Sequence, residues 1–474
     1  MVLVAIAMVA IIAMAALSID VITLYLAREE SQRSADAAAL AAARIISTSG
    51  ITGDPQNVSG LWSNICGTSG IATQAAQAVA TQNGVGGPVP TVTVNYYGAG
   101  NGSSSSSSDC TTLATSTAFG VNPIVTVKVG QTNLPTFFSR VWGTTGNSVS
   151  ATASAEAFNP SNSGGAGNPP IIPVQPRCVK PWVVPNLDPR NPDGCTTNCT
   201  KFIDPASGAI QHAGISLNGA GTNGTIGENF WLESNCIHGS STCNSLRSAT
   251  ASPPTPIQAN LPQNGIDFRE NPPNLLYYPN QVGTTVTAIP SCSQGDLYEE
   301  AIEGCDSPAN YQCGVPNANT LDLSRNPDSG PVTNGVSCLI SQSDTNDTNN
   351  TSGQDFLGPS PSFGNPNAYP FQFLAGPANP LVTSAGLAKN TPISASASIV
   401  SLPIYDQTTA VTVTPGTTTA VTFIGFLQVF INAVDQYGNV NVTVLNVTGC
   451  GNDNTSGTAL AGSSPVPVRL ITPP

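Results

Sequence analysis

The chain has 474 residues, only 9% of them charged, and it is rich in Gly (45) and Pro (40). Acidic residues outnumber basic ones by 27 to 14, and the net charge of -13 excludes the basic surface that nucleic-acid binding requires. The length allows two or three domains, and this composition is typical of an exported surface protein rather than a cytosolic enzyme.

The first 46 residues predict one long helix. Residues 2–19 are apolar except for Ser18, and after Asp20 the apolar run resumes as far as Ala27. At a rise of about 1.5 Å per residue, this run spans a hydrocarbon core of ~30 Å. Residues 28–46 contain no Gly or Pro and are rich in Ala, so the helix should continue as a stalk. The domain 1–46 is therefore predicted to be a transmembrane anchor and stalk helix.

Two other interpretations of the apolar run are open. One is a cleaved signal peptide, with Ala13, Met14 and Ala15 at the cleavage site. The lack of Lys and Arg before the run, and its continuation past this site, disfavour that interpretation. The other is a buried helix of a soluble protein, which the length of the run disfavours.

The predicted stalk has paired charges and a surface of small residues. Glu29 lies four residues before Arg33, and Asp36 lies three residues after it, which are spacings at which helical side chains meet. The alanines that follow allow another helix or a sheet to approach closely. Asp20 is costly in hydrocarbon, so it is expected at the outer edge of the span or beside a polar partner on another helix.

A hydrophobic span that ends in an acidic residue, followed by a Tyr and the run SADAAALAAA, resembles the N-terminal signature of the TadE/TadG-like family of bacterial tight-adherence (Flp) pilus assembly proteins. The matching residues are Asp20, Leu24, Tyr25, Gln32, Ser34, Ala35, Asp36, Ala37, Ala38, Ala39 and Leu40. The family's short basic stretch before the span is absent. A prepilin-type processing signal, a Gly followed by a Glu five residues later at the start of the apolar run, is not visible either, because position 5 is Ala5.

The resemblance implies a membrane protein of a pilus system. Because the sequence has no catalytic or cofactor motif, we expect neither enzymatic activity nor a cofactor. The helix would contact the membrane and other pilus assembly proteins or pilin-like subunits. The candidate site is then the packing surface of the anchor and stalk, formed by Asp20, Tyr25, Arg33, Ala35, Asp36, Ala37, Ala38 and Ala39.

Residues 47–158 predict a small α+β module. Helices are expected at 71–83 and 135–142, and strands at 91–97, 123–129 and 148–158. This order also resembles the family, through Thr136, Phe137, Phe138, Arg140, Val141 and Gly143. The resemblance implies that the module is pilin-like.

The rest of the chain predicts a linker and a β-rich region. Residues 159–170 form the clearest linker, and 171–340 form a Cys-rich, irregular β region with a helical turn at 298–302. Residues 341–393 are a turn-rich excursion. Strands are expected at 394–405, 410–413, 421–434 and 440–447, within a C-terminal β region at 394–474. The last two should form a hairpin through residues 435–439, with 421–434 as a central strand covered on both faces.

All the cysteines follow the predicted span, and their even number in an exported chain indicates disulfides, without showing which residues pair. They are Cys66, Cys110, Cys178, Cys195, Cys199, Cys236, Cys243, Cys292, Cys305, Cys313, Cys338 and Cys450. Cys195 with Cys199, or Cys236 with Cys243 and His238, would also suit zinc, but disulfides are favoured outside the cytosol, so no metal site is predicted.

Little in the sequence nominates an active site. His212 and His238 are the only histidines, and neither lies in a metal-binding or nucleophile motif. Oxygen-rich stretches at 188–194, 322–330 and 344–350 could ligate calcium but lack the EF-hand spacing, so they are interpreted as turns.

The sequence as a whole predicts an α+β protein with a long N-terminal helix, a pilin-like module and a disulfide-stabilised β-rich region. We expect a single-pass protein of the bacterial cytoplasmic membrane, with its bulk in the periplasm or at the cell surface. It would act as a minor pilin-like or assembly component of a tight-adherence pilus. The alternatives are a pilus-independent surface adhesin and, less favoured, an exported hydrolase using His212 or His238.

Overall fold

The structure is a computed structural model, and its described residues form two compact units. The first contains residues 1–46, 62–157 and 468–474, and the second contains 47–61 and 158–467. The described residues are 2–57, 60–87, 89–98, 106–113, 119–134, 146–162, 171–190, 200–215, 224–236, 243, 245–246, 262–263, 265–267, 274–283, 286–287, 292, 297–306, 311–325, 329–346, 352–358, 372–407, 413–451 and 455–472.

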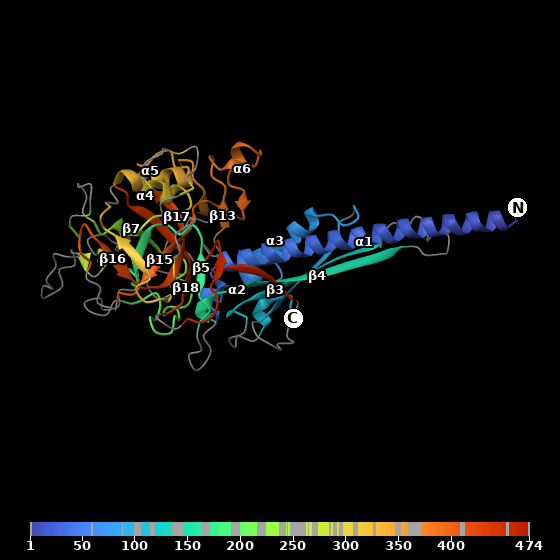
Figure 1. Cartoon of the computed structure of the whole chain (residues 1–474), viewed down its shortest axis with the longest axis horizontal. Helices are drawn as coiled ribbons and strands as arrows, with labels where there is room; N and C mark the ends of the chain where they lie inside the picture. Colours follow the sequence, from blue (N-terminus) through green and yellow to red (C-terminus); the bar gives the residue numbers. More distant parts are fainter. Residues whose placement is uncertain are drawn as a thin grey trace. The chain divides into compact units, whose positions relative to one another are not determined.

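The first unit combines three helices with an antiparallel sheet. The helices are α1 (Val2–Thr48), α2 (Trp62–Cys66) and α3 (Ile71–Gln82). The sheet has the order β2-β1-β3-β4-β20, with β1 at Thr91–Tyr97, β2 at Ser106–Ser107, β3 at Ile124–Leu134, β4 at Asn147–Ala157 and β20 at Val468–Ile471. Figure 1 shows α1 running alongside β4. The predicted helix at 71–83 and the strands at 91–97, 123–129 and 148–158 are thus confirmed, with shifts of at most one residue except that β3 continues five residues further, to Leu134.

The core of this unit follows from the alternation of side chains along its strands. Val125, Val127 and Val129 of β3 are buried. Phe119 packs edge-on against Trp62 and Tyr96, with ring centroids 5.2 and 5.8 Å away. The predicted helix at 135–142, with its aromatic residues, lies outside the described residues.

The second unit is built on an eight-stranded sheet with the order β6-β15-β17-β18-β7-β10-β9-β8. An additional pairing between β6 and β10 closes six of these strands into a ring. The strands are β6 (Trp182–Pro185), β7 (Asn229–Ser234), β8 (Pro262–Gln263), β9 (Ile266–Asp267), β10 (Asn274–Pro279), β15 (Ile399–Tyr405), β17 (Phe423–Val434) and β18 (Val440–Gly449).

Smaller elements complete this unit. Its helices are α4 (Leu297–Glu303), α5 (Ser329–Ile340) and α6 (Pro380–Thr383), with short 3-10 turns η1 (Ile51–Gly53) and η4 (Pro160–Asn162). Three minor sheets pair β11 (Asn319–Asp322) with β16 (Thr418–Val421), β5 (Val174–Pro176) with β19 (Leu460–Gly462), and β12 (Phe356–Gly358), β13 (Gln372–Leu374) and β14 (Pro392–Ile393) with one another. The predicted helical turn at 298–302 is confirmed by α4, whereas α5 was not predicted.

The predicted hairpin is confirmed by β17 and β18, which pair from Gly425 with Gly449 to Val434 with Val440. Every residue of β17 is buried, and β15 and β18 flank it, so it is the doubly covered central strand that its sequence indicates. In the turn, Asp435 Oδ1 accepts hydrogen bonds of 2.8 Å from the backbone N–H groups of Tyr437 and Asn439. The strand begins two residues later than predicted, because 418–421 form the separate strand β16.

Long-range pairing differs from the predicted segmentation in two places. Strands from the Cys-rich region and from the C-terminal region share one sheet, since β7 lies between β18 and β10. The last strand, β20, pairs with β4 of the first unit, where Val468 stands opposite Ala157. The predicted strand at 410–413 lies largely outside the described residues.

The start of the predicted linker at 159–170 needs a correction. Asn159 is buried, and its Nδ2 donates to Thr52 Oγ1 at 3.1 Å and to the Val447 carbonyl oxygen at 3.0 Å. Ser161 Oγ accepts a hydrogen bond from the backbone N–H of Gly449 at 2.5 Å. Residues 159–162 are therefore an ordered part of the second unit because their polar side chains satisfy buried backbone groups, and 163–170 lie outside the described residues.

The expected disulfides are confirmed for every described cysteine. The pairs are Cys66–Cys110, Cys178–Cys305, Cys236–Cys243, Cys292–Cys338 and Cys313–Cys450. Cys195 and Cys199 lie outside the described residues. The Cys313–Cys450 bridge lies in a buried core cluster with Tyr311 and Phe423, so in this unit the cross-links reinforce a packed core.

Candidate functional site

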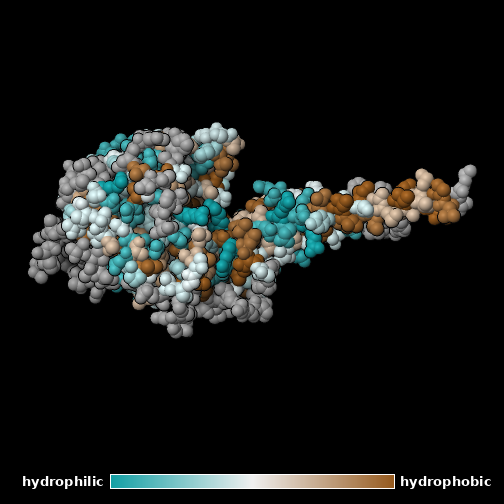
Figure 2. Space-filling view, viewed as in Figure 1, coloured by the Kyte–Doolittle hydropathy of each residue, from teal (hydrophilic) through white to brown (hydrophobic). Residues whose placement is uncertain are grey.

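The N-terminal half of α1 presents a continuous apolar surface. Large apolar side chains are exposed from Leu3, with an exposed fraction of 82%, to Leu26. Figure 2 shows this end of the helix largely in the hydrophobic colour. By its length and composition, α1 is a helix able to cross a membrane. Such a surface is stable where lipid or other apolar helices cover it.

The C-terminal half of α1 packs within its own unit. Its buried positions recur every three or four residues, as one face of a helix does, and they are Ala27, Ser31, Ser34, Ala35, Ala38, Ala39, Ala42, Ala43 and Ile46. Ser34 Oγ donates to the carbonyl oxygen of Ala80 in α3 at 3.3 Å, and the backbone N–H of Gly86 donates to Glu30 Oε2 at 2.8 Å. The small side chains therefore bring α1 close to elements of the same chain.

Asp20 lies on this packed face although exposed apolar residues surround it along the helix. Its exposed fraction is 5%, and Ala16 and Ala27 on the same face are also buried. Asp20 is therefore not part of the exposed apolar surface. Tyr25, by contrast, is exposed on the outer side of the helix.

The charged stalk residues lie mainly on the outer side of α1. Arg33 is exposed and pairs with Glu29 at 3.8 Å, as the four-residue spacing predicts. Asp36 Oδ1 accepts a hydrogen bond from Gln32 Nε2 at 2.8 Å, and Ala37 is half-buried. An exposed pair of this kind contributes only a few tenths of a kcal/mol, so Arg33 is available to a partner at little cost.

The histidines and cysteines that the sequence offered as catalytic or metal-binding candidates form no common site in the described part of the chain. His212 is half-buried, and its carbonyl oxygen accepts a hydrogen bond from the backbone N–H of Thr225 at 3.1 Å, whereas His238 lies outside the described residues. Cys236 and Cys243 are bonded to each other, so they offer no thiolates to zinc.

The stretches considered for calcium form turns where they are described. Asp344 Oδ1 accepts a hydrogen bond from the backbone N–H of Asn346 at 2.9 Å, and Asp188 Oδ1 accepts one from the backbone N–H of Arg190 at the same distance. Asp322 Oδ1 likewise accepts a hydrogen bond from the backbone N–H of Ser324 at 3.1 Å. These contacts are those of Asx turns, which supports the interpretation as turns. Residues 191–199, 326–328 and 347–350 lie outside the described part.

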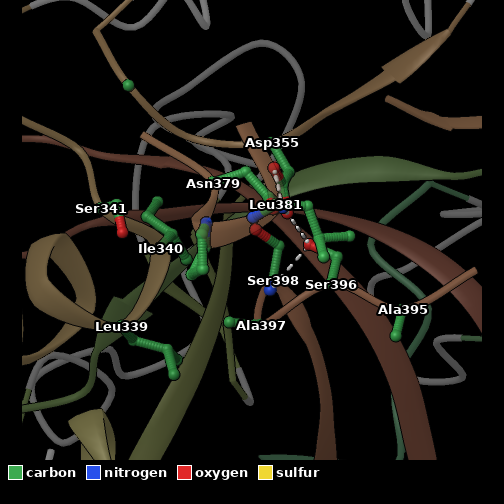
Figure 3. A pocket seen from close by; sticks show the side chains of 12 residues that line it. Leu339, Ile340, Ser341, Asp355, Asn379, Leu381, Ala395, Ser396, Ala397 and Ser398 are labelled. Atoms are coloured by element: carbon green, nitrogen blue, oxygen red, sulfur yellow. Dashed lines mark hydrogen bonds between the residues drawn. The ribbon is translucent and has the colours of Figure 1, made fainter. Parts of the chain in front are cut away.

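A cavity of about 280 Å³ lies between the end of α5, the start of α6 and the segment 395–398. Figure 3 shows Leu339, Ile340 and Leu381 among its lining, with Asp355 and Ser396 at one side. The Asp355 carboxylate accepts hydrogen bonds from groups of its own unit, so its charge holds the structure together and is not directed at a ligand.

Burial of charged side chains is the feature that sequence reasoning missed. Lys180 is buried, and its Nζ donates to the carbonyl oxygen of Gly304 at 2.7 Å. Burial lowers the pKa of Lys180 to about 7. Burial also raises the pKa of Glu228 well above its ordinary value, and a hydrogen-bonded neighbour, Asp188, acts in the same direction. A lone Lys in the apolar run CVKPWVVP was the available signal.

The N-terminal helix thus combines an apolar segment long enough to cross a membrane with a stalk that packs within its own unit. Residues 1–44 match the family model described as Tad, putative Flp pilus-assembly TadE/G-like, which confirms for this segment the resemblance seen in the sequence. Comparison with curated proteins and comparison with solved structures gave no match.

Proposed function

We propose that this protein is a membrane-anchored structural component of a tight-adherence pilus, acting as a minor pilin-like subunit or an assembly factor. The observation that carries the proposal is the coincidence of the family match at 1–44 with α1, whose first half is exposed and apolar. A packed stalk fixes that apolar segment to a folded unit. The partners are the lipid bilayer and the helices of other pilus proteins.

Disulfides support placement of both units outside the cytoplasm. Among the described cysteines, one bridge lies within the first unit and four lie within the second. Such bridges persist in oxidising compartments. The bulk of the chain would lie in the periplasm or at the cell surface. The role is structural rather than catalytic, and the pilin-like character of the first unit belongs to this proposal.

The test is fractionation of sheared cells that carry a tight-adherence system. The chain should be found with the sheared filaments if it is a subunit, or with the cytoplasmic membrane if it is an assembly factor. A double variant, Val9→Asp with Ile12→Asp, should lose both locations, because each charge at the centre of a span costs about 2.5–3.5 kcal/mol.

A matched control makes the same kind of substitution, apolar residue to Asp, outside α1. Val89→Asp with Leu381→Asp also replaces two exposed apolar residues, and it should leave the location unchanged. Recovery of the wild-type chain only as a soluble, shortened form would overturn the proposal in favour of a cleaved signal peptide. An unchanged location and unchanged pilus formation in the Val9→Asp, Ile12→Asp variant would overturn it as well.

A further inference from the structure

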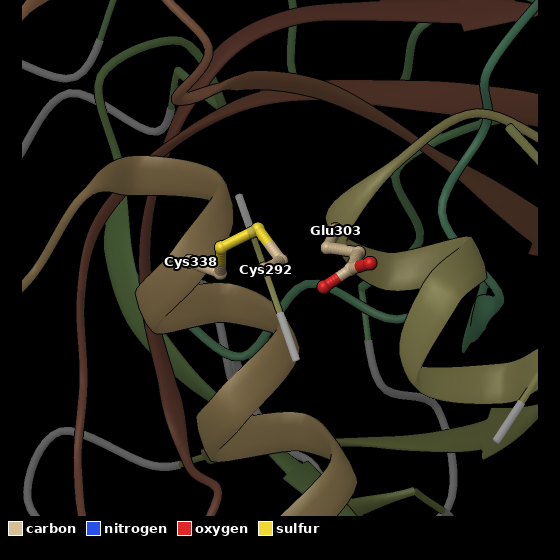
Figure 4. Close-up of side chains that lie close together, drawn as sticks. All are labelled: Cys292, Glu303 and Cys338. Carbon is tan, nitrogen blue, oxygen red and sulfur yellow. A yellow bond between two sulfur atoms is a disulfide. The ribbon is translucent and has the colours of Figure 1, made fainter. Parts of the chain in front are cut away.

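The helices α4 and α5 of the second unit meet beside a disulfide and a carboxylate. Cys338 of α5 is bonded to Cys292, and a carboxylate oxygen of Glu303, at the end of α4, lies within 4.8 Å of both sulfur atoms. Figure 4 shows the disulfide and the Glu303 side chain between the two helices. A metal would need the two sulfurs as thiolates, but here they are bonded to each other.

Glu303 is unusual because its carboxylate is buried and makes no hydrogen bond with the described residues. Its exposed fraction is 1%, and neither carboxylate oxygen has a hydrogen-bond partner among the described residues. A buried carboxylate without hydrogen bonds is costly, whereas a protonated carboxyl is tolerated in such a place. The position therefore favours a carboxylic acid that holds a proton next to the disulfide.

The charged groups around Glu303 support the same protonation state. Burial raises its pKa first, and Glu299 and Glu300 on α4 raise it further, while Lys180 opposes them. The sequence of α5, SGPVTNGVSCLI, contributes no charged side chain. Lys180 is itself buried, and it directs its Nζ to the carbonyl oxygen of Gly304.

We propose that Cys292 and Cys338 form a thiol–disulfide exchange site, whose substrate is a dithiol and whose proton donor is Glu303. Cys338 is a half-buried residue, whereas Cys292 is buried, so attack is expected at Cys338. A thiolate of the dithiol attacks Cys338 Sγ, the bond to Cys292 breaks, and its electron pair remains on Cys292 Sγ. This sulfur takes the proton of Glu303, whose flexible side chain closes the remaining distance as the two sulfurs separate.

The second half of the exchange restores the balance of atoms and electrons. The other thiol of the dithiol loses its proton and attacks the mixed disulfide, which forms the disulfide of the dithiol and leaves Cys338 as a thiolate. Cys338 takes a proton from solvent, and so does Glu303. The dithiol is oxidised by two electrons, the protein disulfide is reduced, and α5 is released from the segment that holds Cys292.

The experiment is reduction of the full-length protein by dithiothreitol, with alkylation of the freed thiols and mapping by mass spectrometry. Cys292–Cys338 should open before Cys236–Cys243, which is buried at both ends and serves as an internal reference. Glu303→Gln should slow its opening by about tenfold or more, because a general acid commonly contributes ~10²-fold or more. Asp344→Asn, a charge change at an exposed residue of the same unit, should stay within about twofold of wild type.

The direction of the Glu303→Gln effect decides between two roles. An ionised Glu303 would repel the departing thiolate, so its removal would speed the reduction, and that result overturns the proposal. An unchanged rate overturns it too. The order of opening in the wild type gives an independent check, since opening of Cys236–Cys243 first would contradict the assignment even if a variant folded poorly.

A pH profile separates proton donation from a merely structural role. With the concentration of attacking thiolate held constant, the wild-type rate should fall as the pH rises through the raised pKa of Glu303, because Glu303 loses its proton over that pH range. The rate of the Glu303→Gln variant should vary less over this range. Parallel profiles for the two proteins would show that Glu303 supplies no proton.

Discussion

At the scale of single residues, Asp355 holds three segments of the second unit together through one carboxylate. Its Oδ1 accepts hydrogen bonds from the backbone N–H of Gly376 and from Asn379 Nδ2, at 2.8 and 2.9 Å. Its Oδ2 accepts one from Ser396 Oγ at 2.7 Å. Because Asp355 is buried, the loss of its carboxylate would leave these donors without an acceptor.

Asp355→Ala should therefore loosen the sheet formed by β12, β13 and β14. We expect a loss of roughly 2–3 kcal/mol in the free energy of opening, measured by hydrogen exchange of the β13 amides. Asp344→Ala is the control, because Asp344 is exposed and its carboxylate accepts hydrogen bonds only from Asn346 among the described contacts. An effect of Asp355→Ala no larger than that of the control would contradict this role.

The buried Lys180 makes the free energy of unfolding depend on pH, and the direction of this dependence follows from its pKa. Burial lowers its pKa from 10.5 to about 7, so between these values the unfolded chain holds a proton that the folded chain does not. Stability must then rise with pH across this window, and the cost of the buried amine is fully present below about pH 7.

The variant Lys180→Met lacks the titrating amine, so its stability should lose the pH dependence that Lys180 causes. The free energy of unfolding of the variant minus that of wild type should fall by on the order of 2–3 kcal/mol between about pH 7 and about pH 9.5. Urea titrations at several pH values measure the difference, and Lys128→Met corrects for the loss of one exposed positive charge. A difference that stays constant with pH would show that Lys180 keeps its proton in the folded state.

At the scale of elements, α1 has two halves with different packing. The stalk half depends on side chains no larger than Ala or Ser along most of its buried face. Small residues at these positions let the helix axis approach α3 and the sheet, which a longer side chain would prevent.

Ala39→Leu should therefore overpack the stalk. Ala39 is fully buried, and we expect a loss of about 1–3 kcal/mol from the added atoms. Hydrogen exchange of the β3 amides measures the effect. Ala37→Leu, at a half-buried position of the same helix, should cost clearly less, and equal effects would show that burial in the structure does not describe the stalk.

Elements that depend on local pattern were predictable from the sequence. The helix α1, the strand β1 and the hairpin of β17 and β18 each have a clear period and a clear turn signal. The turn at 435–439 was found because Asp435 and Gly438 are typical turn residues.

The rest depends on contacts between residues far apart in the chain. No local pattern pairs β20 with β4, or places β7 between β18 and β10. The pairing of Cys292 with Cys338 and the burial of Glu303 likewise become visible only when α4 and α5 are packed. For the candidate site, the sequence predicted the anchor helix and its alanines, but not that the chain itself would cover Asp20.

At the scale of the whole molecule, the second unit interrupts the first. Residues 158–467 lie between β4 and β20, which are neighbours in one sheet and are also joined by Arg469 and Glu156 at 2.8 Å. Each unit has its own sheet, buried residues and disulfides, which predicts separate unfolding.

Calorimetry of the intact chain should show two transitions. Ala39→Leu should lower the temperature of one of them and Asp355→Ala the temperature of the other, since the two residues lie in different units. A single transition that both variants shift would show that the units unfold together.

The interrupted arrangement also decides how the chain responds to pulling and to cleavage. The backbone passes from one unit to the other four times, after residues 46, 61, 157 and 467. A force that draws the larger unit away from the first unit is divided among four covalent connections while the first unit stays folded. A protease that cuts one of them leaves three, so backbone still joins the two units, whereas a cut in a single linker would separate them; the cut segment is then held by packing within its own unit.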